Sequence, residues 1–168
     1  FQFYEHRGYA IEFNCRRMAL PAGEIPPGEG VPLAESSFAG EAALRNRYFN
    51  RCHMFGRWDT RALSYQDIEA GYTGGEVLSF PGGYAYCLPD GDKVLVKELV
   101  LPKDMDFYEV AKAVHRRYGA KEYQYRRWED IPAGELAPYA MAHWIKEKRQ
   151  KKLEDVEGRA SYLGLTLD

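Results

Sequence analysis

The chain has 168 residues, of which 45% are apolar and 29% are charged, with a formal net charge of −2. This length is enough for one domain with a real core. The charge balance excludes the clustered excess of lysine and arginine that nucleic-acid backbones attract. No apolar run approaches the ~20 residues needed to span a bilayer, and no basic-then-apolar signal segment opens the chain. We therefore expect no nucleic-acid or membrane partner. The three cysteines are far apart and suit reduced thiols, so we expect a cytoplasmic protein.

The first 35 residues read as two different segments. The opening FQFYEHRGYAIEF is typical of a helix end that runs into a strand, and residues 8–20 are rich in strand-forming side chains. The stretch at 21–35, PAGEIPPGEGVPLAE, is rich in proline, which removes backbone donors, and in glycine, which raises chain entropy. We therefore expect a linker and a domain boundary at 21–35.

Two helices are predicted next. The segment from Ser36 to Phe55 repeats apolar residues at steps of three and four, which makes one face of a helix that Gly56 would end. A shorter helix is expected in SYQDIEAGYTGG, because Ser64 and Asp67 have capping-box spacing and Gly71 suits the position after a helix. The apolar face of the first helix consists of Phe38, Ala42, Tyr48, Phe49, Cys52 and Phe55.

Three strand-forming runs follow in EVLSFPGGYAYCLPDGDKVLVKELVL. They are separated by Pro81-Gly82-Gly83 and by Pro89-Asp90-Gly91-Asp92, which supply the positive φ angles of tight reversals. The sequence therefore predicts an antiparallel meander. In the third run the alternation slips at Lys97-Glu98, which indicates either a β-bulge or one charge aimed at a cleft.

The remaining chain contains the clearest helix and several late strands. Asp106 and Glu109 have the spacing of a helix cap, an apolar stripe runs from Phe107 to Tyr118, and Gly119 ends the helix. KEYQYRRW then alternates as a strand, and strand–helix–strand order implies a parallel crossover. YAMAHWI fits a strand or a helix, KEKRQKK (146–152) is a solvated basic stretch, and ASYLGLTLD is a final strand.

This order of elements resembles the GNAT superfamily of acetyl-CoA-dependent N-acetyltransferases. Residues 98–102, ELVLP, are similar to the fourth strand of that family, and the resemblance extends over about residues 33–168. Separately, Phe3 to Tyr9 is similar to the FYEKxGF segment at the end of the family's last helix. The resemblance implies an α/β fold with a central mixed sheet and flanking helices. It also implies a tandem GNAT protein, with residues 1–20 as the tail of a preceding domain, 21–35 as linker and 36–168 as the C-terminal GNAT-like domain.

One departure from the family concerns the cofactor. Family members follow the fourth strand with a glycine-containing loop whose backbone N–H groups wrap the pyrophosphate of coenzyme A. This chain passes from Pro102 to the helix through Lys103-Asp104-Met105-Asp106, without those glycines. Two carboxylates would repel a pyrophosphate at the positive end of the helix. We therefore expect the second domain to be degenerate and acetyl-CoA to be bound by the preceding domain, with none bound by this segment alone.

The resemblance also suggests candidate site residues. Tyr4 matches the family position whose phenol often reprotonates the coenzyme A thiolate, and Glu98 lies on the strand from which some members present a general base. Histidine and cysteine show no metal spacing, so no metal is expected. A set of strand residues is a candidate for stacking on a ligand, although aromatic cross-strand pairs beneath a helix are commoner. These residues are Tyr84, Tyr86, Tyr123, Tyr125 and Arg127.

Two functions remain open at this point. In the first, the segment is the non-catalytic C-terminal domain of an N-acetyltransferase and shapes the cleft for an amine substrate, which is a small molecule or a peptide. In the second, it is a non-enzymatic module with a GNAT-like fold that binds a ligand or a protein through its aromatic strands.

Overall fold

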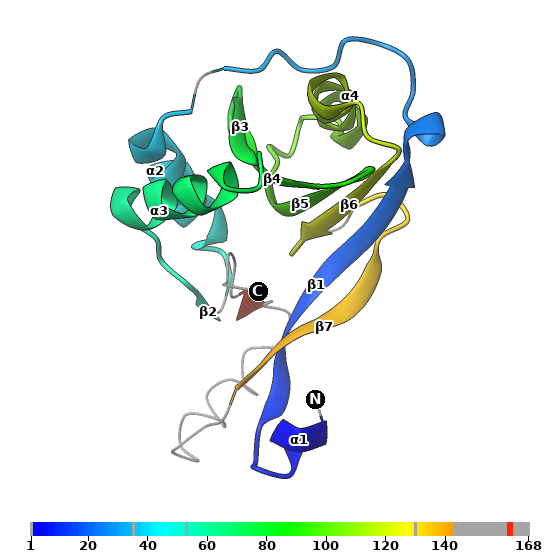
Figure 1. The fold of residues 1–168 in the computed structure, drawn as a ribbon. Helices are drawn as coiled ribbons and strands as arrows, with labels where there is room; N and C mark the ends of the chain where they lie inside the picture. Colours follow the sequence, from blue (N-terminus) through cyan, green and yellow to red (C-terminus); the bar gives the residue numbers. More distant parts are fainter. Residues whose placement is uncertain (1, 35, 53, 130, 143–160, 163–168) are drawn as a thin grey trace.

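A computed structural model describes residues 2–34, 36–52, 54–129, 131–142 and 161–162 (Figure 1). Its elements are α1 (Gln2–Glu5), β1 (Ala10–Pro21), η1 (Ala22–Glu24), α2 (Phe38–Phe49), β2 (Met54–Phe55), α3 (Thr60–Gly71), β3 (Glu76–Phe80), β4 (Gly83–Asp90), β5 (Lys93–Val100), α4 (Phe107–Tyr118), β6 (Glu122–Arg127), β7 (Glu135–Ala142) and β8 (Ser161–Tyr162).

Six strands form one mixed sheet in the order β3-β4-β5-β6-β1-β7. The predicted meander is confirmed, since β3, β4 and β5 pair antiparallel with Gly82 and Gly91 at positive φ in the two turns. The predicted parallel crossover is also confirmed: β5 and β6 pair in parallel, with α4 between them in the chain. The α/β fold with a central mixed sheet and flanking helices is therefore as the sequence predicts. A separate short pair joins β2 and β8.

Each face of the sheet carries its own core. On one face, α4 packs over β4, β5, β6 and the inner half of β1, with Val110, Val114 and Tyr125 among the buried side chains. On the other face, α2 and α3 pack over β3 and β4 (Figure 1). Because side chains alternate along a strand, neighbouring residues of β4 and β5 belong to different cores. Tyr84 and Tyr86 lie in the second core, whereas Ala85 and Cys87 lie in the first.

Helix α4 is the element that the sequence predicts best. Asp106 is its N-cap and accepts a hydrogen bond from the Tyr108 backbone N–H at 3.1 Å. Gly119 ends the helix with a φ of 61°, as the C-terminal signal predicts. The side chain of Glu109 contacts Lys112 at 2.6 Å.

The two earlier helices differ from the prediction in their bounds. Helix α2 ends at Phe49 rather than at Phe55, and Met54–Phe55 form strand β2. Helix α3 begins at Thr60, four residues before the predicted cap, because Asp59 accepts a hydrogen bond from the Ala62 N–H at 2.8 Å. Ser64 lies inside the helix and donates to the Arg61 carbonyl.

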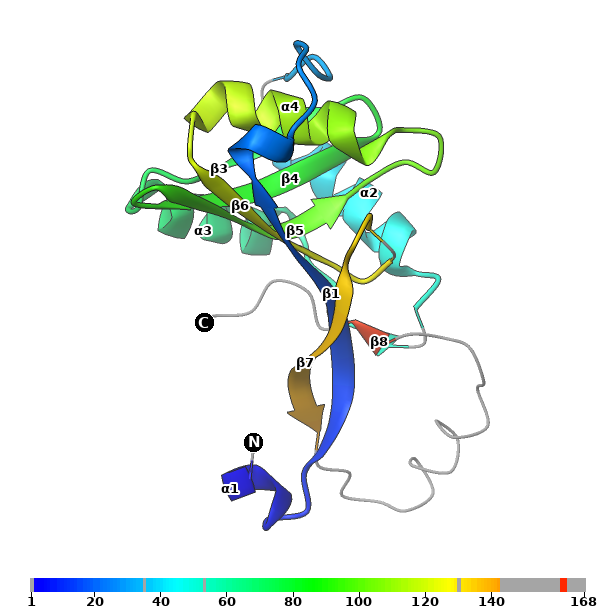
Figure 2. The same ribbon diagram turned by 90° about the vertical axis from the view of Figure 1, so that its right-hand side faces the viewer.

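Strand β1 is shared between the sheet and a long ribbon. Its inner half pairs with β6 through the register Arg16↔Arg127 to Pro21↔Glu122, and its outer part, Ala10 to Arg17, pairs with β7. Beyond the end of β6, β1 and β7 extend together away from the body of the sheet, with α1 at the far end (Figure 2). Residues 10–21 are thus a strand of this sheet. The predicted division into a domain tail, a linker and a second domain stays a prediction.

The segment at 22–34 packs closely on α4. The Val31 N–H donates to the Glu109 carbonyl at 3.0 Å, and Val31 is buried in the core beneath α4. Gly30 lies against the helix backbone with a φ of 74°, and a Cβ there would meet the Glu109 oxygen at 2.4 Å. In this proline- and glycine-rich segment, the backbone therefore lies close to the backbone of α4.

The last predicted elements are only partly described. Residues 139–142 of YAMAHWI belong to strand β7, and Ser161–Tyr162 of ASYLGLTLD form β8. The basic stretch KEKRQKK and the rest of both segments lie outside the described residues. Within the described part of the chain, no helix has the length and apolar character needed to cross a membrane.

Candidate functional site

The irregularity predicted at Lys97-Glu98 is a β-bulge. Tyr86 pairs with Glu98 and the next residue, Cys87, pairs with Val96, so Lys97 is the extra residue of β5. On its other side, β5 pairs with β6 only from Lys93 to Val96. Both strands continue past this point, β5 to Val100 and β6 to Arg127. The bulge thus marks the place where the two parallel strands separate.

Glu98 points into the core at this place and forms an ion pair with Arg45 of α2. The Arg45 Nε donates to Glu98 Oε1 at 2.9 Å, and Nη2 donates to Oε2 at 3.1 Å. The Tyr84 hydroxyl donates a further hydrogen bond to Oε1. Both charged side chains are fully excluded from solvent. A buried carboxylate requires hydrogen-bond donors and an opposite charge, and here Arg45 and Tyr84 supply them.

Two aromatic rings and a backbone carbonyl hold Arg45 in position. Its Nη1 donates to the Gly56 carbonyl at 2.5 Å. The guanidinium lies over the rings of Phe49 at 5.0 Å and Trp58 at 5.4 Å. Asn46, the next residue of α2, hydrogen-bonds both the N–H and the carbonyl of Trp58. The loop after β2 is therefore fixed to α2 beside the ion pair.

A second polar group lies one helical turn further along α2. The Tyr48 hydroxyl donates to Glu129 Oε2 at 2.5 Å and accepts from Arg127 Nη2 at 2.9 Å. Arg127 and Arg51 both contact the Glu129 carboxylate, at 2.6 Å and 2.9 Å. Burial raises the pKa of Tyr48 to about 12, so this phenol keeps its proton at neutral pH.

Helix α2 therefore bridges the two strands where they separate. Arg45 binds Glu98 of β5, and Tyr48, three residues later, binds Arg127 at the end of β6. Positions i and i+3 lie on one helix face, so a single face of α2 reaches both strands. The side chains that lie between the diverging strands are thus hydrogen-bonded to one another, Arg45 to Glu98 and Arg127 to Tyr48.

Three backbone N–H groups of the turn between β5 and α4 are engaged within the protein. The Met105 N–H donates to the Pro102 carbonyl, and the Glu109 N–H donates to the Asp106 carbonyl. The Tyr108 N–H is taken by the Asp106 side chain. A hollow of about 740 Å³ opens on this turn, and its charged lining residues are Asp104, Asp106 and Glu109. Such a lining repels an anionic group.

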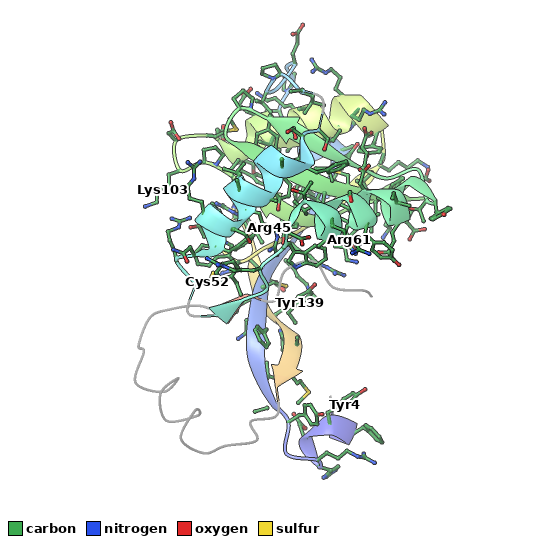
Figure 3. The ribbon with its side chains drawn as sticks, turned by 90° about the vertical axis from the view of Figure 1, so that its left-hand side faces the viewer. Tyr4, Arg45, Cys52, Arg61, Lys103 and Tyr139 are labelled. Atoms are coloured by element: carbon green, nitrogen blue, oxygen red, sulfur yellow. The ribbon has the colours of Figure 1, made fainter. Side chains whose placement is uncertain are left out.

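Tyr4 and Glu98 are not brought together. Tyr4 lies on α1 at the end of the ribbon, where it is 52% exposed and packs edge-on against Phe3 and Tyr9. Glu98 and its partner Arg45 lie in the body of the domain (Figure 3). A joint role of these two residues in one active site is not supported by this arrangement.

The four candidate tyrosines are buried and lie on opposite faces of the sheet. Tyr84 and Tyr86 pack under α2 and α3, and the Tyr86 hydroxyl donates to the Gln66 carbonyl. Tyr123 and Tyr125 pack under α4, where the Tyr123 hydroxyl contacts His115 Nδ1 at 2.8 Å. These rings form core, not an exposed stacking surface. Arg127 is buried too, and Glu129 and Tyr48 engage it.

Sequence reasoning missed Arg45, which completes the site. The signal was present, because Arg45 falls between Ala42 and Phe49 on the apolar stripe of the predicted helix. A charge within such a stripe requires a buried partner, and Glu98 was the charge within an apolar strand.

Comparisons with known proteins agree on the fold. No family model and no curated protein sequence matches this chain. One solved structure, a conserved protein of unknown function and probable N-acyltransferase from Enterococcus faecalis V583, superposes with a TM-score of 0.59 at 18% identity, over 83% of this chain and 42% of that one. A GCN5-related N-acetyltransferase from Kribbella flavida superposes with a TM-score of 0.55 at 16% identity, over 85% and 38%. The chain has the GNAT fold, and it spans about two fifths of the length of each of these proteins.

Proposed function

We propose that this chain is the C-terminal, degenerate GNAT-like domain of a larger N-acetyltransferase, in which a preceding GNAT domain holds acetyl-CoA. The single observation that carries the proposal is the turn at 102–106. The Met105, Tyr108 and Glu109 N–H groups at and after this turn are engaged by Pro102 and Asp106, and carboxylates line the adjoining hollow. The two solved structures of the same fold are each more than twice as long as the part they share with this chain, which leaves room for a second domain.

The bridge formed by α2 supports the same function. Where β5 and β6 separate, Arg45 and Tyr48 tie the strands to the helix through buried ion pairs and hydrogen bonds. Breaking a buried pair costs roughly 3–5 kcal/mol, so a ligand that entered there would have to offset that cost. Glu98 in this arrangement is a structural carboxylate, because its oxygens are engaged by Arg45 and Tyr84 and no part of it is exposed.

In the whole protein, this domain would support the fold and shape the cleft for an amine substrate. The chemistry in the preceding domain would be direct attack of a neutral amine on the thioester, with one group removing the amine proton and another returning a proton to sulfur. Tyr4 is exposed on the ribbon, where a neighbouring domain can reach it. We assign the proton-returning role to Tyr4 only in that setting.

A titration of the chain with acetyl-CoA tests the proposal. A ligand that binds the native state raises the melting temperature in a concentration-dependent way. We expect no shift for this chain and no acetyl transfer from it, with both appearing in the longer protein. A saturable rise in melting temperature, or turnover by this chain alone, would count against the proposal.

A further inference from the structure

A hollow lies between α4 and the strap, the proline- and glycine-rich residues 22–31 that pass beside this helix (Figure 2). The strap is fixed at both of its ends. The Ala22 N–H donates to the Lys121 carbonyl at 2.9 Å, just after α4, and the Val31 N–H donates to the Glu109 carbonyl at 3.0 Å, near the start of α4. The hollow has a volume of about 410 Å³. This volume is within the range of small-ligand sites, roughly 300–1,000 Å³.

One wall of the hollow is apolar and the other is cationic. The strap supplies the apolar side chains of Ile25, Pro26 and Pro27. Helix α4 supplies Lys112, His115 and Arg116, whose spacing places them on one face of the helix. None of the residues that line the hollow carries a carboxylate. Its electrostatic character therefore favours an anion.

Lys112 is held beneath the strap. A Cβ added at Gly28 would meet the Lys112 Nζ at 3.3 Å, so the strap passes directly over this amine. The side chain of Lys112 is only 15% exposed. Its Nζ donates to Glu109 Oε1 at 2.6 Å, which is its one acceptor among the described residues. Because an ammonium has three N–H donors, it can bind a further oxygen.

Arg116 has a weaker partner. The nearest carboxylate is that of Glu29, whose Oε2 lies 4.0 Å from Arg116 Nη1. This distance is too long for a hydrogen bond, and the Glu29 side chain is 93% exposed. An exposed ion pair of this kind contributes little. The guanidinium fork can therefore still take a carboxylate.

His115 adds a neutral donor to the same wall. The Tyr123 hydroxyl accepts a hydrogen bond from the Ala120 N–H at 2.8 Å and lies 2.8 Å from His115 Nδ1. We assign the hydroxyl proton to Nδ1, since that nitrogen is the acceptor within reach. The neutral ring then carries its own proton on Nε2. No described residue accepts this Nε2 proton, so it is available to a ligand.

We propose that this hollow binds a small aliphatic dicarboxylate. One carboxylate would pair with the Arg116 guanidinium, whose planar fork matches it, and the other with the Lys112 ammonium. Residues four apart on a helix have Cβ atoms about 5–6 Å apart, so one short ligand can reach both cations. The His115 Nε2–H would be a third donor, and the hydrocarbon chain would lie on the apolar wall.

The position of the hollow along α4 opposes binding in part. The C-terminal end of a helix carries about half a negative charge, whereas Lys112 and Arg116 carry two full positive charges, so attraction exceeds repulsion. The proposal goes beyond the function proposed above and does not depend on it.

Glutarate is the probe, and the readout is the backbone amide signals of Gly28 and residues 112–116 in NMR spectra of the ¹⁵N-labelled chain. Valerate has the same number of carbons and one carboxylate, and 1,5-diaminopentane has the same number of carbons and the opposite charge. We expect saturable shifts with glutarate. Valerate should bind about tenfold more weakly, the scale of one charged hydrogen-bonded contact, and the diamine should cause no shift at these amides.

Substitutions test the assigned roles. Arg116→Gln should weaken glutarate binding about tenfold and remove its advantage over valerate. Glu29→Gln should strengthen glutarate binding about twofold, because a competing carboxylate is removed. Arg117→Gln is the matched control: it makes the same charge change at the next residue of α4, which does not line the hollow, and should leave the affinity unchanged.

The opposite effects expected for Arg116→Gln and Glu29→Gln separate binding from stability. No saturation with glutarate, equal affinities for glutarate and valerate, saturable shifts of the same amides with 1,5-diaminopentane, or equal weakening by Arg117→Gln would each overturn the proposal.

Discussion

Arg45 and Glu98 are 53 residues apart in the chain and form a bidentate ion pair from which solvent is fully excluded. The pair joins α2 to β5 at the bulge where β5 parts from β6. Removing one partner of such a pair leaves an uncompensated buried charge, whereas removing both leaves mainly a packing problem.

This asymmetry predicts the outcome of a double-mutant cycle. Arg45→Met and Glu98→Gln should each lower the free energy of unfolding by about 3–5 kcal/mol. The double variant should lose much less stability than the sum of the two single losses. Urea titration measures the free energy of unfolding of all three variants. Arg51→Met is the control, because its ion pair with Glu129 is partly exposed and is worth about 0–1 kcal/mol. Additive losses would show that the two charges do not interact.

A glycine substitution tests the packing of the 22–34 segment on α4. Gly30→Ala should destabilise by more than about 1 kcal/mol, because Gly30 has a φ of 74° and an added Cβ meets backbone atoms of α4 at 2.4 and 2.5 Å. Gly23→Ala is the matched control, since a Cβ there meets nothing within 4 Å. Thermal melts compare the two. If Gly30→Ala were as stable as Gly23→Ala, residues 22–34 would not be held against α4.

Alkaline pH should unfold the protein. Burial raises the pKa of Tyr48 and of Tyr86 to about 12, above the ordinary value of 10.0. Below pH 10 both phenols are protonated in the folded and unfolded states, so their contribution to stability is complete. Between pH 10 and 12 only the unfolded state loses these protons, so stability falls as the pH rises. Urea midpoints across this range, read with tyrosinate absorbance, should fall together, and a flat profile would be inconsistent with buried phenols.

The three cysteines should be unreactive in the folded protein. Burial raises the pKa of the Cys52 thiol to about 12 and that of Cys87 above its usual range, and Cys15 is 1% exposed. Since the thiolate is the nucleophile, a thiol reagent such as iodoacetamide should label none of them at neutral pH. Mass spectrometry in denaturant should show labelling of all three. Rapid labelling of the native chain at Cys52 would mean that the aromatic core beside α2 opens.

Local signals explain which elements the sequence predicts correctly. Helix α4 has its cap at Asp106, its stop at Gly119 and one apolar face, and each signal acts within a few residues. The turns at Gly82 and Gly91 fix the meander in the same way. For α3 the predicted cap at Ser64 was wrong, because Asp59 accepts the Ala62 N–H and Ser64 lies inside the helix.

Long-range contacts account for what the sequence left undetermined. The apolar repeat continues to Phe55, but α2 ends at Phe49 because the following residues form β2 beside β8, about a hundred positions away. The alternation in β4 and β6 shows that their tyrosines point inward. It does not show that those of β4 lie under α2 and α3 and those of β6 under α4. Glu98 stood out as a charge in an apolar strand, whereas Arg45 was missed, and only the fold pairs the two residues.

The most direct measurement is an NMR titration of the ¹⁵N-labelled chain with acetyl-CoA, read at the backbone amides of Met105, Tyr108 and Glu109. The account predicts that these amides stay unshifted, because Pro102 and Asp106 already engage the Met105, Tyr108 and Glu109 N–H groups. Saturable shifts centred on this turn would show that the N-terminus of α4 accepts the cofactor's diphosphate and would contradict the account.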